Sequence, residues 1–246
     1  MGTVFSFDIR APRTPAIHRA LREAVLWLHH VNATYSTYRP DSTISRLARG
    51  ELTPDRCSPE VRGVLALCDD AAHTTDGWFS PLASGTLDPS GLVKGWAVEH
   101  ASQILYEAGA HNTCVNGGGD LQARGEPSPG TPWRIGIADP LRPGALSTVV
   151  TGRDFAVATS GTAERGAHIL VPHHGTPAVG PASLTLTGPR LTMTDAYATA
   201  AYAMGTRAQD WLENLDGYEG FALARNGTTW HTSGFPGATP PAADQS

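Results

Sequence analysis

Cysteine, charged residues and long apolar runs are all scarce in this chain of 246 residues. Its three cysteines, Cys57, Cys68 and Cys114, are odd in number and widely spaced. That pattern fits neither a disulfide framework nor the paired spacing of a zinc site, so we expect buried or free thiols. No stretch approaches the roughly 20 consecutive apolar residues that a membrane-spanning helix needs. The sequence therefore predicts no transmembrane span.

Charged residues make up 17% of the chain, and the net charge is −5. A surface that binds nucleic acid needs clustered Lys and Arg, so this balance argues against nucleic acid as the main partner. Small anions stay open as ligands because one local site is enough to bind them. The first ten residues lack the charged and then apolar regions of a signal peptide. We therefore expect a cytoplasmic protein, and an extracytoplasmic location stays open should a further segment precede residue 1.

Strand and helix patterns follow one another without a regular β-α-β rhythm. Period-two alternation and β-formers predict strands at residues 3–9, 112–116, 133–137, 149–151, 155–159, 182–187, 221–224 and 228–231. Apolar periodicity and capping residues predict helices at residues 16–33, 58–75, 93–108 and 192–205. Two hairpins are expected, around residues 152–154 and at Asn226 and Gly227. We predict a mixed α/β (α+β) single unit over residues 1–232 and a disordered tail over residues 233–246.

The stretch TLDPSGLVKGWAVEHA at residues 86–101 is the most informative part of the sequence. Asp88 lies in a Pro/Ser/Gly turn, Lys94 follows, and the residues after it have helical spacing, with Leu92, Trp96 and His100 four apart. Backbone N–H groups at a helix N-terminus attract anions. The stretch is thus a candidate phosphate or metal–phosphate site, and a capped surface helix without a ligand fits the same pattern equally well.

Other polar groups have two interpretations each. Asp195 and Thr199 lie four apart in the predicted helix 192–205, so one face presents two hard oxygen ligands suited to Mg²⁺; alternatively, Asp195 interacts with the helix dipole. The GGGD sequence at residues 117–120 indicates a sharp turn or a close approach of the backbone to a neighbour, and it is not a dinucleotide fingerprint. The loop containing Tyr38 and Arg39 has the residues to stack on an aromatic ligand, although a packed turn explains it too.

Eight short motifs, in order along the chain, resemble those of the ApbE family, the FAD:protein FMN transferases. They are MGT at 1–3, STYRPDS–SRL at 36–47, DPSGLVKGWAVEHA at 88–101, VNGGGD at 115–120, PWRIGIADP at 132–140, AVATSG at 156–161, HIL-x-P at 168–172 and TDAYATAAYAMG at 194–205. Each is weak alone, but together they cover nearly the whole chain except the tail.

The resemblance implies a transferase with a compact fold of a mixed sheet and flanking helices. Such an enzyme uses Mg²⁺ to split FAD, attaches FMN through a phosphoester to a Thr or Ser of a target flavoprotein, and releases AMP. By matching motif, Asp195, Thr199 and the Gly91 carbonyl would hold Mg²⁺, and His168 would be the catalytic base. The residues that would line the FAD site are Met1, Tyr38, Trp78, Phe79, Ser80, Asp88, Lys94 and Ile169.

One departure from the family pattern motivates an alternative function. Val171 occupies a position where the family usually has Asp. If that Asp orients the neighbouring His or the substrate, this chain would transfer FMN more slowly, or another group would take over the role of the Asp. The alternative is an FAD-binding protein or FAD pyrophosphatase without transfer activity.

Overall fold

The computed structural model describes residues 3–161 and 169–238 of the chain. Its helices are α1 (Pro15–Tyr35), α2 (Thr43–Ala48), α3 (Pro59–Thr74), α4 (Ser90–Glu107), α5 (Leu191–Met204) and α6 (Ala208–Glu213), with 3-10 turns η1 (Pro54–Arg56) and η2 (Gly205–Arg207). Its strands are β1 (Phe5–Ile9), β2 (Thr113–Gly117), β3 (Asp120–Arg124), β4 (Trp133–Ala138), β5 (Leu146–Gly152), β6 (Phe155–Gly161), β7 (Leu170–Val171), β8 (Thr176–Pro177), β9 (Ser183–Gly188), β10 (Glu219–Leu223), β11 (Thr229–His231) and β12 (Gly237–Ala238).

Local sequence signals account for several of these boundaries. The hydroxyl of Ser58 accepts a hydrogen bond from Val61 N at 3.3 Å, and Pro59 is the first residue of α3, as the capping pattern predicts. Thr14 caps α1 in the same way, through Ile17 N at 3.2 Å. The predicted turn at Asn226 joins β10 to β11 in an antiparallel hairpin. These elements form where strong local propensities agree with the tertiary packing.

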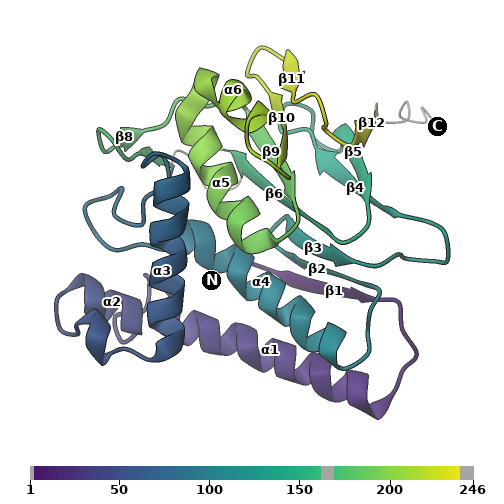
Figure 1. The fold of residues 1–246 in the computed structure, drawn as a ribbon, viewed down its shortest axis with the longest axis horizontal. Helices are drawn as coiled ribbons and strands as arrows, with labels where there is room; N and C mark the ends of the chain where they lie inside the picture. The colour runs from purple at the N-terminus through teal and green to yellow at the C-terminus, as the bar shows by residue number, and fades with distance from the viewer. Residues whose placement is uncertain (1–2, 162–168, 239–246) are drawn as a thin grey trace.

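The strands form a seven-stranded sheet in the order β1-β2-β3-β6-β9-β10-β11, a three-stranded sheet in the order β12-β5-β4, and the small β7–β8 hairpin. The pairs described are antiparallel throughout. Helices α4 and α5 pack on one face of the large sheet, and α1 packs outside α4 (Figure 1). The predicted α+β class is confirmed.

The two faces of the large sheet contribute to different cores, because successive side chains of a strand point to opposite sides. Ala156 and Ala158 of β6 pack into the main core beneath α4 and α5. Val157, between them, joins a smaller core with Trp133 and Ile137 of β4. The small sheet therefore covers the face opposite the helices, and the molecule has three layers near β6.

The structure corrects three expectations. The predicted hairpin around residues 152–154 is wrong, since β5 pairs with β4 in the small sheet while β6 pairs with β3 and β9 in the large one. A hydrophobic alternation marks each strand but does not name its partner. Helix α4 begins at Ser90 rather than at residue 93. The structured part also continues past the predicted boundary at residue 233, since Gly237 and Ala238 pair with β5.

Among the helices that the structure describes, none combines the length and the apolar character needed to cross a membrane.

Candidate functional site

A cavity of about 440 Å³ lies where α4, α5, the large sheet, the small sheet and the loop after α3 meet. Nine of the residues predicted for the site line it: Trp78, Phe79, Ser80, Asp88, Gly91, Lys94, Ile169, Asp195 and Thr199. Tyr38 is not among the lining residues and is 91% exposed on the loop before α2. Met1 and His168 lie outside the described residues. The structure thus brings most of the predicted residues into one cavity.

The close approach of α4 and α5 places charged groups of both helices together. A Cβ atom added to Gly95 of α4 would lie 2.5 Å from the Leu191 carbonyl oxygen and 2.8 Å from Asp195 Cβ of α5. Only a glycine permits this approach. The Gly95 N–H, which a regular helix directs to the Gly91 carbonyl, donates to Asp195 Oδ2 at 2.9 Å.

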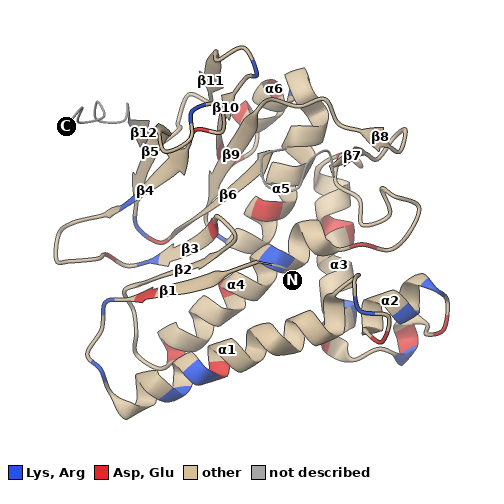
Figure 2. Cartoon of the chain, turned by 180° about the vertical axis from the view of Figure 1, so that it is seen from behind, with Lys and Arg blue, Asp and Glu red and all other residues tan. Residues whose placement is uncertain are grey.

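Lys94 joins two carboxylates from different elements. Its Nζ forms an ion pair with Asp120 Oδ2 and lies 3.5 Å from Asp195 Oδ1. Asp120, the last residue of the GGGD motif, also accepts a hydrogen bond from Thr159 N at 2.9 Å. In Figure 2 the helix α5 is uncharged along its length except at one acidic position, which its sequence identifies as Asp195. With the three groups ionised, this cluster carries one surplus negative charge.

Burial is the main influence on Asp195, whose side chain is 5% exposed. Desolvation disfavours its carboxylate and raises its pKa to about 7, although Lys94 lowers the pKa and Asp120 raises it further. A buried carboxylate that is costly to ionise becomes easier to ionise when a cation lies beside it. The site therefore favours an added positive charge near Asp195.

Gly91 and Thr199 bring a carbonyl and a hydroxyl into the same region. A Cβ atom on Gly91 would lie 3.3 Å from Thr199 Oγ1 and 3.3 Å from Phe79 Cε2. Phe79 is held by its N–H, which donates to Thr75 Oγ1 at 3.0 Å, while Thr75 Oγ1 donates to the Ala71 carbonyl of α3 at 2.7 Å. Asp88 turns the chain into α4 by accepting a hydrogen bond from Ser90 N at 3.0 Å. The expected position of Asp88 and Gly91 at a helix N-terminus is confirmed.

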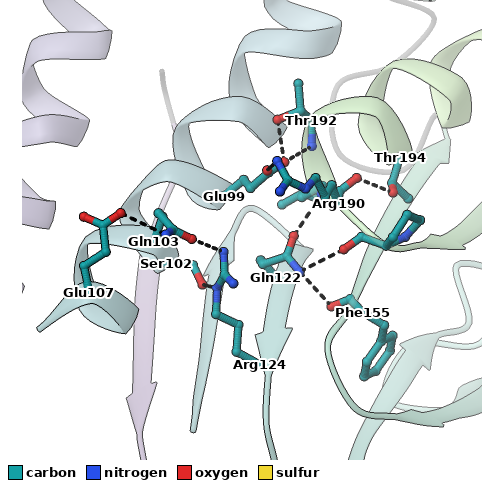
Figure 3. A network of polar contacts seen from close by, with 12 residues as sticks. Glu99, Ser102, Gln103, Glu107, Gln122, Arg124, Phe155, Arg190, Thr192 and Thr194 are labelled. Atoms are coloured by element: carbon teal, nitrogen blue, oxygen red, sulfur yellow. Dashed lines mark hydrogen bonds and ion pairs between the residues drawn. The ribbon is translucent and has the colours of Figure 1, made fainter. Parts of the chain in front are cut away.

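A second polar network fixes the N-terminus of α5 against α4 and β3 (Figure 3). Glu99 Oε2 of α4 accepts hydrogen bonds from Thr192 N at 3.0 Å and Thr192 Oγ1 at 2.6 Å. Gln122 of β3 accepts from Leu191 N at 2.9 Å through Oε1. These contacts satisfy N–H groups that the first turn of a helix leaves without partners. They hold α5 at the height along α4 at which Asp195 meets Gly95.

The model of the ApbE family matches residues 1–86 and 82–222, which is most of the chain. The chain belongs to the ApbE family.

Curated relatives are similar to this chain over part of its length. The FAD:protein FMN transferase of Rhodobacter capsulatus is 28% identical over 193 residues, or 75% of this chain and 34% of its own length. That of Salmonella typhimurium is 26% identical over 156 residues, or 59% of this chain and 45% of its own. The matched region thus spans less than half the length of either relative.

Solved structures show the shared fold. The flavin transferase ApbE of Vibrio cholerae superimposes with a TM-score of 0.79 at 22% identity, over 95% of this chain and 94% of its own. The apo flavinyl transferase ApbE of Pseudomonas stutzeri gives a TM-score of 0.80 at 23% identity, over 95% and 92%. At these identities the likeness establishes the fold shared with ApbE proteins.

The predicted site residues of this ApbE-family chain omitted one central group. Asp120 pairs with Lys94 inside the cavity, yet only its place after three glycines marked it in the sequence. Asn116 stabilises that turn, since its Oδ1 accepts from Gly119 N at 3.1 Å. Ser160, at the end of β6, also lines the cavity and was not singled out. The sequence offered one signal for Asp120: an acidic residue that follows a glycine-rich turn and begins a strand.

Any metal site here depends on mixed oxygen donors. Across residues 3–161 and 169–238, no three His, Cys, Asp or Glu side chains are grouped so that they could hold a metal ion. The available set at Asp195 is one carboxylate with the Thr199 hydroxyl and the Gly91 carbonyl. Such hard oxygens suit Mg²⁺, which keeps several water or phosphate ligands and needs few from the protein.

Proposed function

We propose that this chain is a Mg²⁺-dependent FAD:protein FMN transferase, which attaches FMN through a phosphoester to a Thr or Ser of a target flavoprotein and releases AMP. The observation that carries the proposal is the convergence of Asp195, Thr199, Gly91 and Lys94 in one cavity between α4 and α5. The name that the curated relatives share, FAD:protein FMN transferase, supports the same reaction.

The residues present fit a magnesium ion. Asp195 supplies a carboxylate whose ionisation is unfavourable without a nearby cation, and the Lys94–Asp120–Asp195 cluster has a surplus negative charge. Thr199 and the Gly91 carbonyl add neutral oxygens. When bound, Mg²⁺ neutralises pyrophosphate oxygens and so stabilises the charge that develops during phosphoryl transfer.

The chain's own residues position the dinucleotide. Lys94 lies near the N-terminus of α4, where both its charge and the backbone N–H groups favour a phosphate. Asp120 and Asp195 hold the Lys94 ammonium in place. Trp78, Phe79 and Ile169 provide apolar surface for the ring systems of FAD. Asp88 and Ser80 add polar groups to the same lining, whereas Tyr38 and Met1 remain predicted FAD contacts.

A general base is needed because a neutral hydroxyl is a weak nucleophile. We propose that His168 takes the proton of the acceptor hydroxyl; this residue lies outside the described part of the chain. Its neighbour in the sequence, Ile169, lines the cavity, which supports this proposal. A base in that role contributes roughly 10²–10⁴ in rate.

The alternative is FAD binding or FAD hydrolysis without transfer, and Val171 favours it. This side chain is partly buried and packs against the main core, so it supplies neither charge nor hydrogen bond at the position where the family usually has Asp. The transferase remains our proposal because Lys94, Asp195 and Thr199 are all present in the cavity.

The test incubates the purified chain with FAD, MgCl₂ and a flavin-free candidate target flavoprotein. Mass spectrometry follows the acceptor, and chromatography follows AMP and FMN. We expect an acceptor that gains one FMN, with one AMP released, and no reaction in EDTA. Asp195→Asn should abolish the reaction and weaken Mg²⁺ binding, whereas Asp210→Asn, at an exposed acid of α6, should match the wild type.

Each other outcome has a defined meaning. AMP and free FMN without a labelled acceptor, repeated over several target flavoproteins, would favour the pyrophosphatase. Tight FAD binding without AMP would favour the binding protein. Full activity of Asp195→Asn would contradict the metal assignment.

A further inference from the structure

Two separate elements converge on the indole of Trp78, which lines the cavity. The ring of His173, from the turn of the β7–β8 hairpin, lies edge-on to the indole with centroids 4.7 Å apart and planes at 88°. The Arg207 guanidinium carbon of η2 lies 5.7 Å from the centroid of the same indole. Both ribbon views show the β7–β8 hairpin beside one end of α3 and α5 (Figures 1 and 2). These two contacts, from segments distant from Trp78 in the sequence, limit the orientations that its side chain can adopt.

The backbone before Trp78 leaves room for His173. Asp76 and Gly77 both have positive φ, at 49° and 77°, in the tight turn that ends α3. Gly77 N donates to the Ala72 carbonyl at 2.8 Å, and Trp78 N donates to the Thr75 carbonyl at 2.9 Å. A Cβ atom on Gly77 would lie 3.3 Å from His173 Cε1. Glycine at this position therefore serves both the turn and the contact with the His173 ring.

The hairpin that carries His173 is itself anchored at the cavity. His174 N and Gly175 N both donate to the Val171 carbonyl, at 3.1 and 2.8 Å, and Ala178 N donates to the Ile169 carbonyl at 2.8 Å. Leu170 and Pro172 of the same segment line the cavity. His173 thus projects from a backbone that forms part of the cavity wall.

Arg207 connects the indole to the helix that carries Asp195 and Thr199. It ends the η2 turn that continues directly from α5. Its guanidinium lies over the negatively polarised face of the Trp78 ring, and none of the ion pairs among the described residues involves Arg207.

We infer that Arg207 and His173 are positioning residues, which hold the indole of Trp78 against the cavity and thereby set the affinity for FAD. The inference rests on the proposed function for the identity of the ligand. A ring that is already fixed loses less conformational entropy when a flat ligand packs on it. Loss of either partner should raise the dissociation constant of FAD, with little effect on turnover at saturating FAD, because neither residue belongs to the Lys94–Asp195 cluster.

The experiment measures FAD binding and the state of the indole separately. Calorimetry gives the dissociation constant of FAD for the wild type, Arg207→Met, Arg207→Lys and His173→Ala. We expect about three- to tenfold weaker binding for Arg207→Met, as for the loss of one cation–π contact, and partial recovery for Arg207→Lys. The indole N–H resonance of Trp78, assigned with Trp78→Phe in ¹⁵N-labelled protein, should shift in Arg207→Met and in His173→Ala.

Matched controls and a double variant make the result specific. Arg22→Met and His29→Ala alter exposed residues of α1 and should leave both measurements unchanged. In a Trp78→Phe background, Arg207→Met should weaken FAD binding less than it does alone. An equal loss in both backgrounds would overturn the inference, because Arg207 would then contact FAD itself.

The proposed function and this inference can fail separately. A wild type that binds no FAD would refute the proposed function, and the indole resonance would still report whether Arg207 and His173 hold the ring. An unchanged resonance, or wild-type FAD affinity in both Arg207→Met and His173→Ala, would overturn the inference while leaving the transferase proposal intact.

Discussion

Gly95→Ala should disturb the packing of α4 on α5 and with it the geometry around Asp195. The added methyl carbon would lie 2.5 Å from the Leu191 carbonyl oxygen, 2.8 Å from Asp195 Cβ and 3.0 Å from the Leu191 carbonyl carbon. Two of these three atoms belong to the backbone, so no rotamer change relieves the contact. The helices must separate by several tenths of an ångström or more.

The expected loss follows from two opposing effects. Alanine favours a helix over glycine by about 1 kcal/mol. Overpacking a filled interface costs about 1–3 kcal/mol, and the shift also lengthens the bond from Gly95 N to Asp195 Oδ2, now 2.9 Å. Because the contact is with backbone, we expect the overpacking to dominate and the free energy of unfolding to fall by about 1–2 kcal/mol.

Gly63→Ala is the matched control, because Gly63 is also a helical glycine but no atom lies within 4 Å of its added Cβ. It should raise the free energy of unfolding by about 0.4–1 kcal/mol. Urea denaturation of both variants gives these values, and calorimetry with MgCl₂ shows whether metal affinity falls in Gly95→Ala alone. Equal stabilisation by both substitutions, with unchanged Mg²⁺ affinity, would refute the argument that the α4–α5 approach requires a glycine.

Mg²⁺ binding should weaken as the pH falls below 7, because burial raises the pKa of Asp195 to about 7 and a proton competes with the metal for its carboxylate. Calorimetry should show the affinity decreasing by up to about tenfold per pH unit in that range, and a flat profile would contradict it. In the absence of metal, the same shift sets how the free energy of unfolding depends on pH. The pKa of Asp195 is higher in the folded chain than in the unfolded chain. Its contribution to stability is therefore complete below the unfolded pKa and is lost as the pH rises through about 7. Glu99→Ala removes the acceptor of two Thr192 hydrogen bonds and should lower the free energy of unfolding by about 1 kcal/mol in urea titrations. Glu107→Ala, at the exposed end of α4, is its control and should have little effect, so equal losses would contradict the capping role.

Elements with strong local signals were predicted well. The Ser58–Pro59 start of α3 and the turn at Asn226 depend on residues a few positions apart, so the sequence contains all the information that forms them. The α4 start was predicted three residues late, because the helix opens with Ser90 and Gly91, which apolar periodicity does not report. The false hairpin at residues 152–154 arose since two adjacent strands need not pair, and here they separate into different sheets.

The candidate site divides in the same way. Motif resemblance found nine residues that the fold brings to one cavity, since chemistry of this kind depends on short stretches with fixed residue types. Asp120 was missed as a partner of Lys94, because the two residues are 26 positions apart in the sequence. They meet only because β3 packs beside α4 in the folded chain. Tyr38 was predicted for the FAD site but is exposed outside the lining.

By itself, the sequence determined the α+β class, most helices and strands, and the residue types that line the candidate site. Those properties follow from local propensity, from apolar periodicity and from the chemistry of side chains close in the sequence. The tertiary structure alone decided which strands pair, that Gly95 lets α5 approach α4, that Lys94 bridges Asp120 and Asp195, and that Arg207 and His173 meet at Trp78. Each of these depends on contacts between residues distant in the chain, whose distances are set only when the helices and sheets pack together.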